Sequence, residues 1–145
     1  MTIPAAVSLA TLGVADVGES TRFYTELGFE LSPASVAGEV SFFRAAGGIL
    51  AVWSAEALRQ DAGIEQPLVT HQFRGVALAI NVVDRATVDS SMTHAEASGA
   101  RIVKPATATP WGGYQGYFTD PDGHLWEIAH NPDWPIGDDG RPQLP

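Results

Sequence analysis

The chain contains no cysteine, and Lys104 is its single lysine. The absence of cysteine excludes disulfides, thiolate metal ligands and a thiol nucleophile. Eight basic against 17 acidic side chains give a net charge of −9, which leaves no basic surface for a nucleic-acid backbone. No apolar run approaches the roughly 18–20 residues that cross a membrane, and the first residues lack the basic flank of a signal peptide. We therefore expect a cytoplasmic protein that binds neither nucleic acid nor membrane, and small molecules are the remaining partners.

Two halves of the chain show the same order of predicted elements, and hydrophobic residues make up 45% of the sequence, enough for a buried core. In each half an apolar strand precedes an aspartate that can cap a helix, and a glycine ends that helix. The first half has a strand at 7–14, caps Asp16 and Gly28, and strands at 31–36, 40–44 and 49–54. The second half has a strand at 76–83 and caps Asp84 and Gly99. Residues 99–102 are the counterpart of residues 28–31, with Pro105 matching Pro33, and strands at 113–119 and 124–129 follow.

This repetition predicts one α+β domain spanning residues 1–145 and built from two βαβββ modules. The modules cover residues 7–54 and 75–130, and the linker 55–74 joins them. The proline- and glycine-rich tail 131–145 is expected to be irregular. An accidental self-similarity within another α+β fold is the alternative.

Two stretches resemble a known family. The first is Leu12-Gly13-Val14-Ala15-Asp16 followed by Phe23-Tyr24 and Leu27-Gly28-Phe29, and the second runs from Gly113 through Asp120-Pro121-Asp122-Gly123 to Glu127. They resemble the vicinal oxygen chelate superfamily, which includes glyoxalase I, extradiol dioxygenases and bleomycin-binding proteins. The resemblance implies that the two modules pair into a curled mixed sheet around a cleft, and it suggests a homodimer.

The resemblance also implies four metal-ligand positions, one on the first and one on the last strand of each module. They map onto Leu9, Gly75, Ala51 (Val52 if the register slips by one residue) and Glu127. Only Glu127 can ligate through its side chain, whereas a divalent metal normally needs three or four donors. We therefore expect no cofactor, and a metal only at a non-standard site such as one that combines His71 with Glu127.

Strand alternation predicts which side chains line the cleft. Glu127 is the candidate polar anchor, because a carboxylate among small apolar side chains can receive a cation or act as a general acid or base. The predicted ligand-binding residues are Leu9, Thr11, Trp53, Ala77, Trp111, Tyr114 and Glu127.

Three functions remain open at this point. The first is a metal-independent protein that binds a small aromatic or cationic molecule. The second is a metal-dependent enzyme, either a glyoxalase-type lyase or isomerase or an extradiol-type dioxygenase. The third is a non-catalytic interaction subunit whose cleft is filled by its own side chains.

Overall fold

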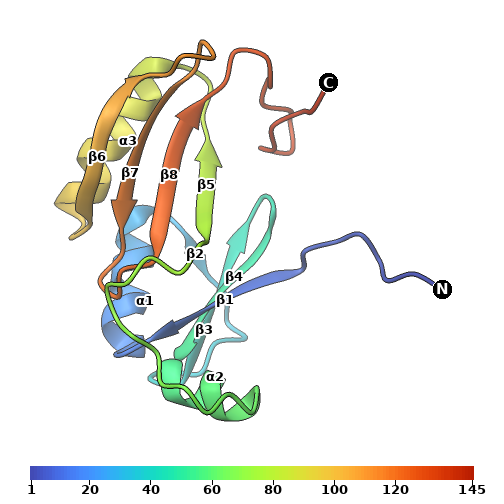
Figure 1. Cartoon of the computed structure of the whole chain (residues 1–145), viewed down its shortest axis with the longest axis vertical. Helices are drawn as coiled ribbons and strands as arrows, with labels where there is room; N and C mark the ends of the chain where they lie inside the picture. Colours follow the sequence, from blue (N-terminus) through green and yellow to red (C-terminus); the bar gives the residue numbers. More distant parts are fainter. The chain divides into compact units, whose positions relative to one another are not determined.

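The computed structural model describes all residues, 1–145, and divides into two compact units, Met1–Leu68 and Val69–Pro145 (Figure 1). Each unit contains one four-stranded sheet with helices packed on it. The element order is βαβββ in both units, with one extra helix after the first. The α+β class and the two βαβββ modules are therefore confirmed.

The first unit has its strands in the order β1-β4-β3-β2. Its first and last strands are parallel neighbours, and the other pairs are antiparallel. Its elements are β1 (Leu9–Val14), α1 (Val17–Leu27), β2 (Glu30–Leu31), β3 (Val40–Ala45), β4 (Gly48–Ser54) and α2 (Ala55–Asp61).

Helix α1 begins and ends where the sequence predicts. The carboxylate of Asp16 accepts a hydrogen bond from the Glu19 backbone N–H at 2.9 Å, and Gly28 ends the helix with φ of 119°. A left-handed residue at this position is accessible to glycine without steric cost. Phe23 and Tyr24 are fully buried, and Tyr24 contacts the ring of Phe43 on β3. The aromatic pair thus fixes the helix on one face of the sheet.

The second unit repeats this arrangement with strand order β5-β8-β7-β6. Asp84 caps its helix by accepting a hydrogen bond from the Thr87 backbone N–H at 2.7 Å. Gly99 follows the helix with φ of 108°. The elements are β5 (Ala77–Asn81), α3 (Arg85–Ala97), β6 (Arg101–Ala108), β7 (Tyr114–Thr119) and β8 (Leu125–His130).

One predicted strand is shorter in the structure. The strand expected over 31–36 is only the two residues of β2, because Pro33 has no N–H for a strand ladder and Ser35 bonds locally to Phe42 instead. The linker begins with a helix, α2, whose N-cap is Ser54.

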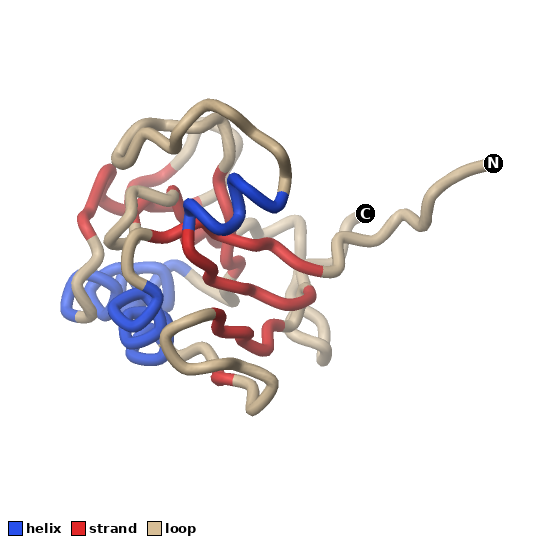
Figure 2. Tube along the Cα trace, turned by 90° about the horizontal axis from the view of Figure 1, so that it is seen from below, coloured by secondary structure: helices blue, strands red, loops and turns tan.

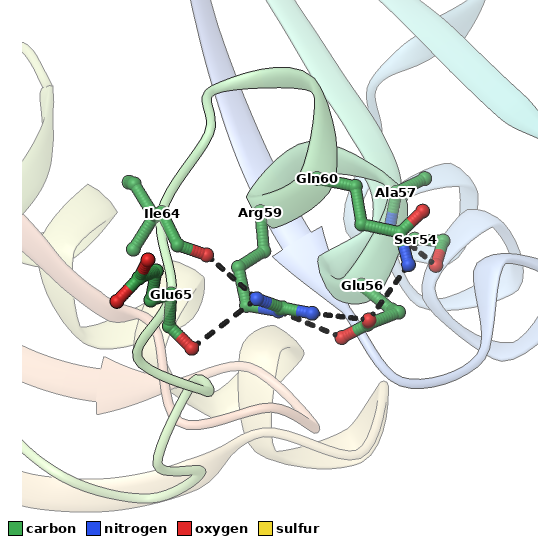
Figure 3. Close-up of polar contacts among 7 residues, drawn as sticks. All are labelled: Ser54, Glu56, Ala57, Arg59, Gln60, Ile64 and Glu65. Atoms are coloured by element: carbon green, nitrogen blue, oxygen red, sulfur yellow. Dashed lines mark hydrogen bonds and ion pairs between the residues drawn. The ribbon is translucent and has the colours of Figure 1, made fainter.

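Helix α2 is tied to the segment that follows it through Arg59 (Figure 3). The guanidinium donates two hydrogen bonds to the carboxylate of Glu56 and further ones to the backbone oxygens of Ile64 and Glu65. The hydrogen bonds from Arg59 and Gln60 lower the pKa of Glu56 to about 2. This exposed cluster therefore holds the end of α2 against the segment that follows it.

Both chain ends are irregular. Residues 1–8 form a loop that leads into β1 (Figure 2). Beyond β8 the tail folds back on itself through an isolated bridge between Ile136 and Pro142. No helix has the length and apolar character needed to span a membrane.

Candidate functional site

Within the second unit, α3 covers one face of the sheet, and the unit has no helix on the other face, which is called the helix-free face below. Trp126 and Ile128 are buried on the helix side, as is Phe118, which stacks on Trp126. Gly116 faces the helix so closely that a Cβ there would lie 2.8 Å from the Met92 side chain. Because neighbouring residues of a strand point to opposite faces, the odd-numbered residues of β7 and β8 face away from α3.

A hydrogen-bonded pair lies in the middle of this helix-free face. Tyr117 and Glu127 are direct partners across β7 and β8, and the phenol donates to the Glu127 Oε2 at 2.5 Å. The side-chain amide of Gln115 donates in turn to the Tyr117 hydroxyl at 3.4 Å. The three groups form a chain of donors that ends at the carboxylate.

The Glu127 carboxylate disfavours ionisation of Tyr117. The hydrogen bond to Glu127, together with burial and the negative charge of that carboxylate, raises the pKa of Tyr117 to about 12. The phenol therefore stays protonated, and able to donate, up to a higher pH than a free tyrosine. Only one oxygen of Glu127 is used by Tyr117, so the carboxylate retains acceptor capacity for another molecule.

Small and apolar residues flank the pair. Ala79 is the partner of Glu127 on β5, and Ala77 is the partner of Leu125, so all these side chains share the helix-free face. Ala77 and Ala79 are exposed, whereas Glu127 is half-buried. Short side chains next to a polar group leave room for a ligand to reach that group.

The corresponding face of the first sheet carries no carboxylate at its centre. Thr11 pairs with Ala51, and Ala51 pairs with Phe42. Leu9 and Trp53 lie on this same face, since they are two residues from Thr11 and from Ala51 along their strands. Three predicted ligand-binding residues, Leu9, Thr11 and Trp53, thus share one face of the first unit.

The structure places two predicted aromatic residues away from Glu127. Tyr114 faces α3, where its hydroxyl donates to Asp89 at 2.6 Å and its ring lies 5.3 Å from the Arg85 guanidinium. The hydrogen bond to Asp89 raises the pKa of Tyr114. Trp111 lies in the β6–β7 turn and folds over Gly113. The aromatic residue beside Glu127 is Tyr117, which is not among the predicted ligand-binding residues.

Tyr117 could have been found from strand parity. In a two-residue alternation, Tyr114 and Tyr117 cannot share a face of β7, and the facing partner of Glu127 follows from the turn between the two strands. The turn at Asp120-Pro121-Asp122-Gly123 sets this register.

The metal-ligand positions implied by the family resemblance do not provide a set of donors. Gly75 lies before β5, and the strand pairing shows that Ala77, not Gly75, corresponds to Leu9. Of Leu9, Ala51, Ala77 and Glu127, only the last has a metal-ligating side chain. No group of three or more His, Cys, Asp or Glu residues converges anywhere in the structure. The residues at these positions therefore do not fit a bound divalent metal.

The histidines are engaged elsewhere in the second unit. His124 Nδ1 lies 3.0 Å from the Arg74 Nη2, and His130 Nδ1 lies 3.2 Å from the Val82 backbone oxygen. His71 lies in the loop before β5 with φ of 59° and sits against Gly123, whose Cβ would be 2.7 Å from the His71 Cα. His124 and His130 therefore do not supply a third ligand to a metal site that would combine His71 with Glu127.

The family is defined by sequence comparison as well as by fold. Residues 6–128 match the model of the Glyoxalase/Bleomycin resistance protein/Dioxygenase superfamily. The chain belongs to this superfamily.

Solved structures similar to the chain include a glyoxalase-related enzyme from Fulvimarina pelagi, with 40% identity, coverage of 97% of this chain and 98% of that chain, and a TM-score of 0.85. A glyoxalase/bleomycin resistance protein/dioxygenase from Nocardioides has 27% identity, coverage of 90% and 85%, and a TM-score of 0.74. A hypothetical protein from S. aureus is 20% identical, with coverage of 90% and 96% and a TM-score of 0.76, and it supports the fold alone. No curated protein matches the chain.

Proposed function

We propose that the protein binds a small aromatic or cationic molecule on the helix-free face of its second sheet, with Glu127 as the polar anchor and without a divalent metal. The observation that carries the proposal is the Glu127 carboxylate held by the Tyr117 phenol at 2.5 Å. A preorganised carboxylate accepts an N–H donor or a cation without having to be reoriented on binding.

Each neighbour of the carboxylate has a part in the proposed binding. Tyr117 is a positioning residue, because its hydroxyl fixes Glu127 and its ring offers a flat surface to an aromatic ligand. Ala77 and Ala79 leave space beside the anchor. The net charge of −9 favours the approach of a cation.

A metal-independent enzyme is the second candidate. The 40% identical relative is described as a glyoxalase-related enzyme, and a half-buried carboxylate that is hydrogen-bonded to a phenol can serve as a general base toward a bound substrate. In this hypothesis Glu127 accepts the proton and Tyr117 holds the carboxylate in place. The metal-dependent lyase, isomerase and dioxygenase hypotheses lack support from the donor set.

The test uses benzylamine as a probe with an aromatic ring and a cation, and benzyl alcohol as its neutral counterpart. We expect Glu127→Gln to weaken benzylamine binding at least severalfold in an NMR titration, because the cation loses its charged partner. Glu96→Gln, which removes a carboxylate from the exposed surface of α3, is the matched control and is expected to leave the affinity unchanged. Equal affinities for Glu127→Gln and the unchanged protein would contradict the proposal.

A separate measurement tests the proposal that the protein binds its ligand without a divalent metal. We expect elemental analysis of the purified protein to show no stoichiometric metal and Ni²⁺, Zn²⁺, Mn²⁺ and Fe²⁺ to give no specific thermal shift, since a native-state ligand must raise stability. Stoichiometric metal that is lost in Glu127→Gln would overturn this part and favour the metal-dependent enzyme.

A further inference from the structure

We propose that Lys104 is a second anchor on the same face and that the ligand therefore carries an oxyanion, such as a carboxylate, in addition to a cationic or N–H donor group. This inference rests on the proposed function and specifies its ligand class. It makes Lys104 a specificity-determining residue for molecules with two opposite charges.

The strand pairing places Lys104 in one row with the Tyr117–Glu127 pair. Lys104 on β6 is the partner of Tyr117, Tyr117 is the partner of Glu127, and Glu127 is the partner of Ala79 on β5. Directly paired residues project from the same face of a sheet. The row therefore runs across four strands, with a cation near one edge, a carboxylate at its centre and a methyl group at the other edge.

The backbone of β6 is irregular on both sides of Lys104. The pairing of β6 with β7 shifts between Ile102 and Lys104 and again between Lys104 and Thr107. Pro105 follows directly and cannot donate to the ladder. Bulges occur next to binding sites because they redirect a side chain without disrupting the rest of the strand, and here two of them isolate the only lysine of the chain.

The charge of Lys104 is not used within the protein. The ion pairs of the structure are formed by Arg22, Arg44 and Arg59, and each of these arginines has a glutamate partner. The side chain of Lys104 is exposed and takes part in no hydrogen bond or ion pair, and the same is true of the Arg101 side chain on the same strand. In a chain with twice as many acidic as basic residues, two unpaired cations on one strand point to an anionic partner from outside.

The distance between the two anchors limits the shape of the ligand. Lys104 and Glu127 are separated by two strand spacings, which corresponds to about 10 Å between their Cα atoms. The flexible lysine side chain can shorten this span by bending over Tyr117. A single aromatic ring with opposite charges at its two ends fits this arrangement, and the ring would lie above Tyr117.

Three probes with the same ring test the proposal in NMR titrations of the whole chain. 4-(Aminomethyl)benzoate carries both charges, whereas benzylamine carries only the cation and benzoate only the anion. We expect 4-(aminomethyl)benzoate to bind most tightly. Lys104→Gln should weaken the binding of 4-(aminomethyl)benzoate and of benzoate about two- to fivefold and leave benzylamine unchanged, as for an exposed charge pair.

Two control variants separate a local contact from a general charge effect. Lys104→Arg keeps the charge and should retain most of the affinity for 4-(aminomethyl)benzoate. Arg44→Gln removes one positive charge from β3 of the first unit and should change none of the three affinities. Melting temperatures of all variants establish that the fold is intact.

The possible failures are distinguishable. If 4-(aminomethyl)benzoate binds no more tightly than benzylamine, or if Lys104→Gln and Arg44→Gln have the same effect, the second anchor is wrong and the Glu127 site stands. If benzylamine binding is indifferent to Glu127→Gln, the proposed function fails, whatever the result for Lys104. If none of the probes binds at millimolar concentration, both proposals are contradicted for this ligand class.

Discussion

The two sheets have the same topology but opposite chemistry in equivalent rows. In the first unit the row is Thr11, Ala51 and Phe42, and in the second unit it is Ala79, Glu127 and Tyr117. Thr11 and Ala79 occupy equivalent positions, because each lies the same number of residues before the aspartate that caps the following helix. Each first strand also pairs in parallel with the last strand of its unit.

The difference shows that the two faces of each sheet are under separate constraints. Both helix-facing sides bury an aromatic core, Phe43 with Tyr24 in the first unit and Phe118 with Trp126 in the second. The opposite faces share their backbone pairing, which does not depend on the side chain. The side chains on these faces can therefore differ between the two halves without a change of topology.

The largest effect is expected when a carboxylate is introduced in the first sheet at Ala51, the position equivalent to Glu127. Ala51 is 1% exposed, so Ala51→Glu would bury a charge without a partner, and we expect a loss of roughly 3–5 kcal/mol in the free energy of unfolding. Chemical denaturation measures this loss. The matched control is Ala77→Glu on the second sheet, where the side chain is exposed and the expected change is within about 0.5 kcal/mol.

A second substitution in the same row is expected to restore part of the stability lost in Ala51→Glu. Phe42 occupies the position that Tyr117 has in the second unit, so Phe42→Tyr added to Ala51→Glu provides the missing donor. We expect the double variant to regain about 1 kcal/mol relative to Ala51→Glu. An additive loss in the double-mutant cycle would show that the two rows are not interchangeable.

A smaller effect is expected from breaking the polar row itself. Tyr117→Phe removes the hydrogen bond to Glu127 and should cost about 1 kcal/mol at neutral pH. Because the pKa of Tyr117 is raised from 10.0 to about 12, its contribution is complete below pH 10 and is lost between pH 10 and 12. Unfolding experiments across this range should show the unchanged protein and Tyr117→Phe converging as the pH rises, and parallel curves would contradict the pairing.

The smallest effect concerns the exposed pair of Glu56 and Arg59 on α2 of the first unit. The pKa of Glu56 is lowered from 4.5 to about 2, so its contribution to stability is present above pH 4.5 and is lost as the pH falls toward 2. Because the pair with Arg59 is exposed, we expect Glu56→Gln to lower the melting temperature less than Tyr117→Phe does at neutral pH. The difference from the unchanged protein should vanish in acid.

Much of the fold was predictable because its signals are local. Asp16 and Asp84 cap helices through backbone groups three residues away, and Gly28 is the residue that a left-handed helix end favours. The predicted strand over 31–36 was wrong in length, because the local hydrogen bonds of Ser35 compete with the sheet and cannot be weighed from alternation alone.

The site was less predictable because it depends on register between strands. Glu127 was identified from the family resemblance, but its partner Tyr117 follows only from the pairing of β7 with β8. Tyr114 was chosen instead, although its parity directs it toward Asp89 on α3. Gly75 was assigned in place of Ala77 because a two-residue shift in an apolar strand leaves the hydrophobic pattern unchanged.

The parallel pairing of first and last strands has a consequence for the order in which each unit forms. β1 has its only strand neighbour in β4, and β5 has its only strand neighbour in β8. During synthesis the first strand of each unit therefore waits unpaired until the last strand has emerged from the ribosome, and closure of the sheet is a late and long-range event. In each half the sheet is complete only when the final strand has paired with the first strand. In the second half, this final strand is the one that carries Glu127.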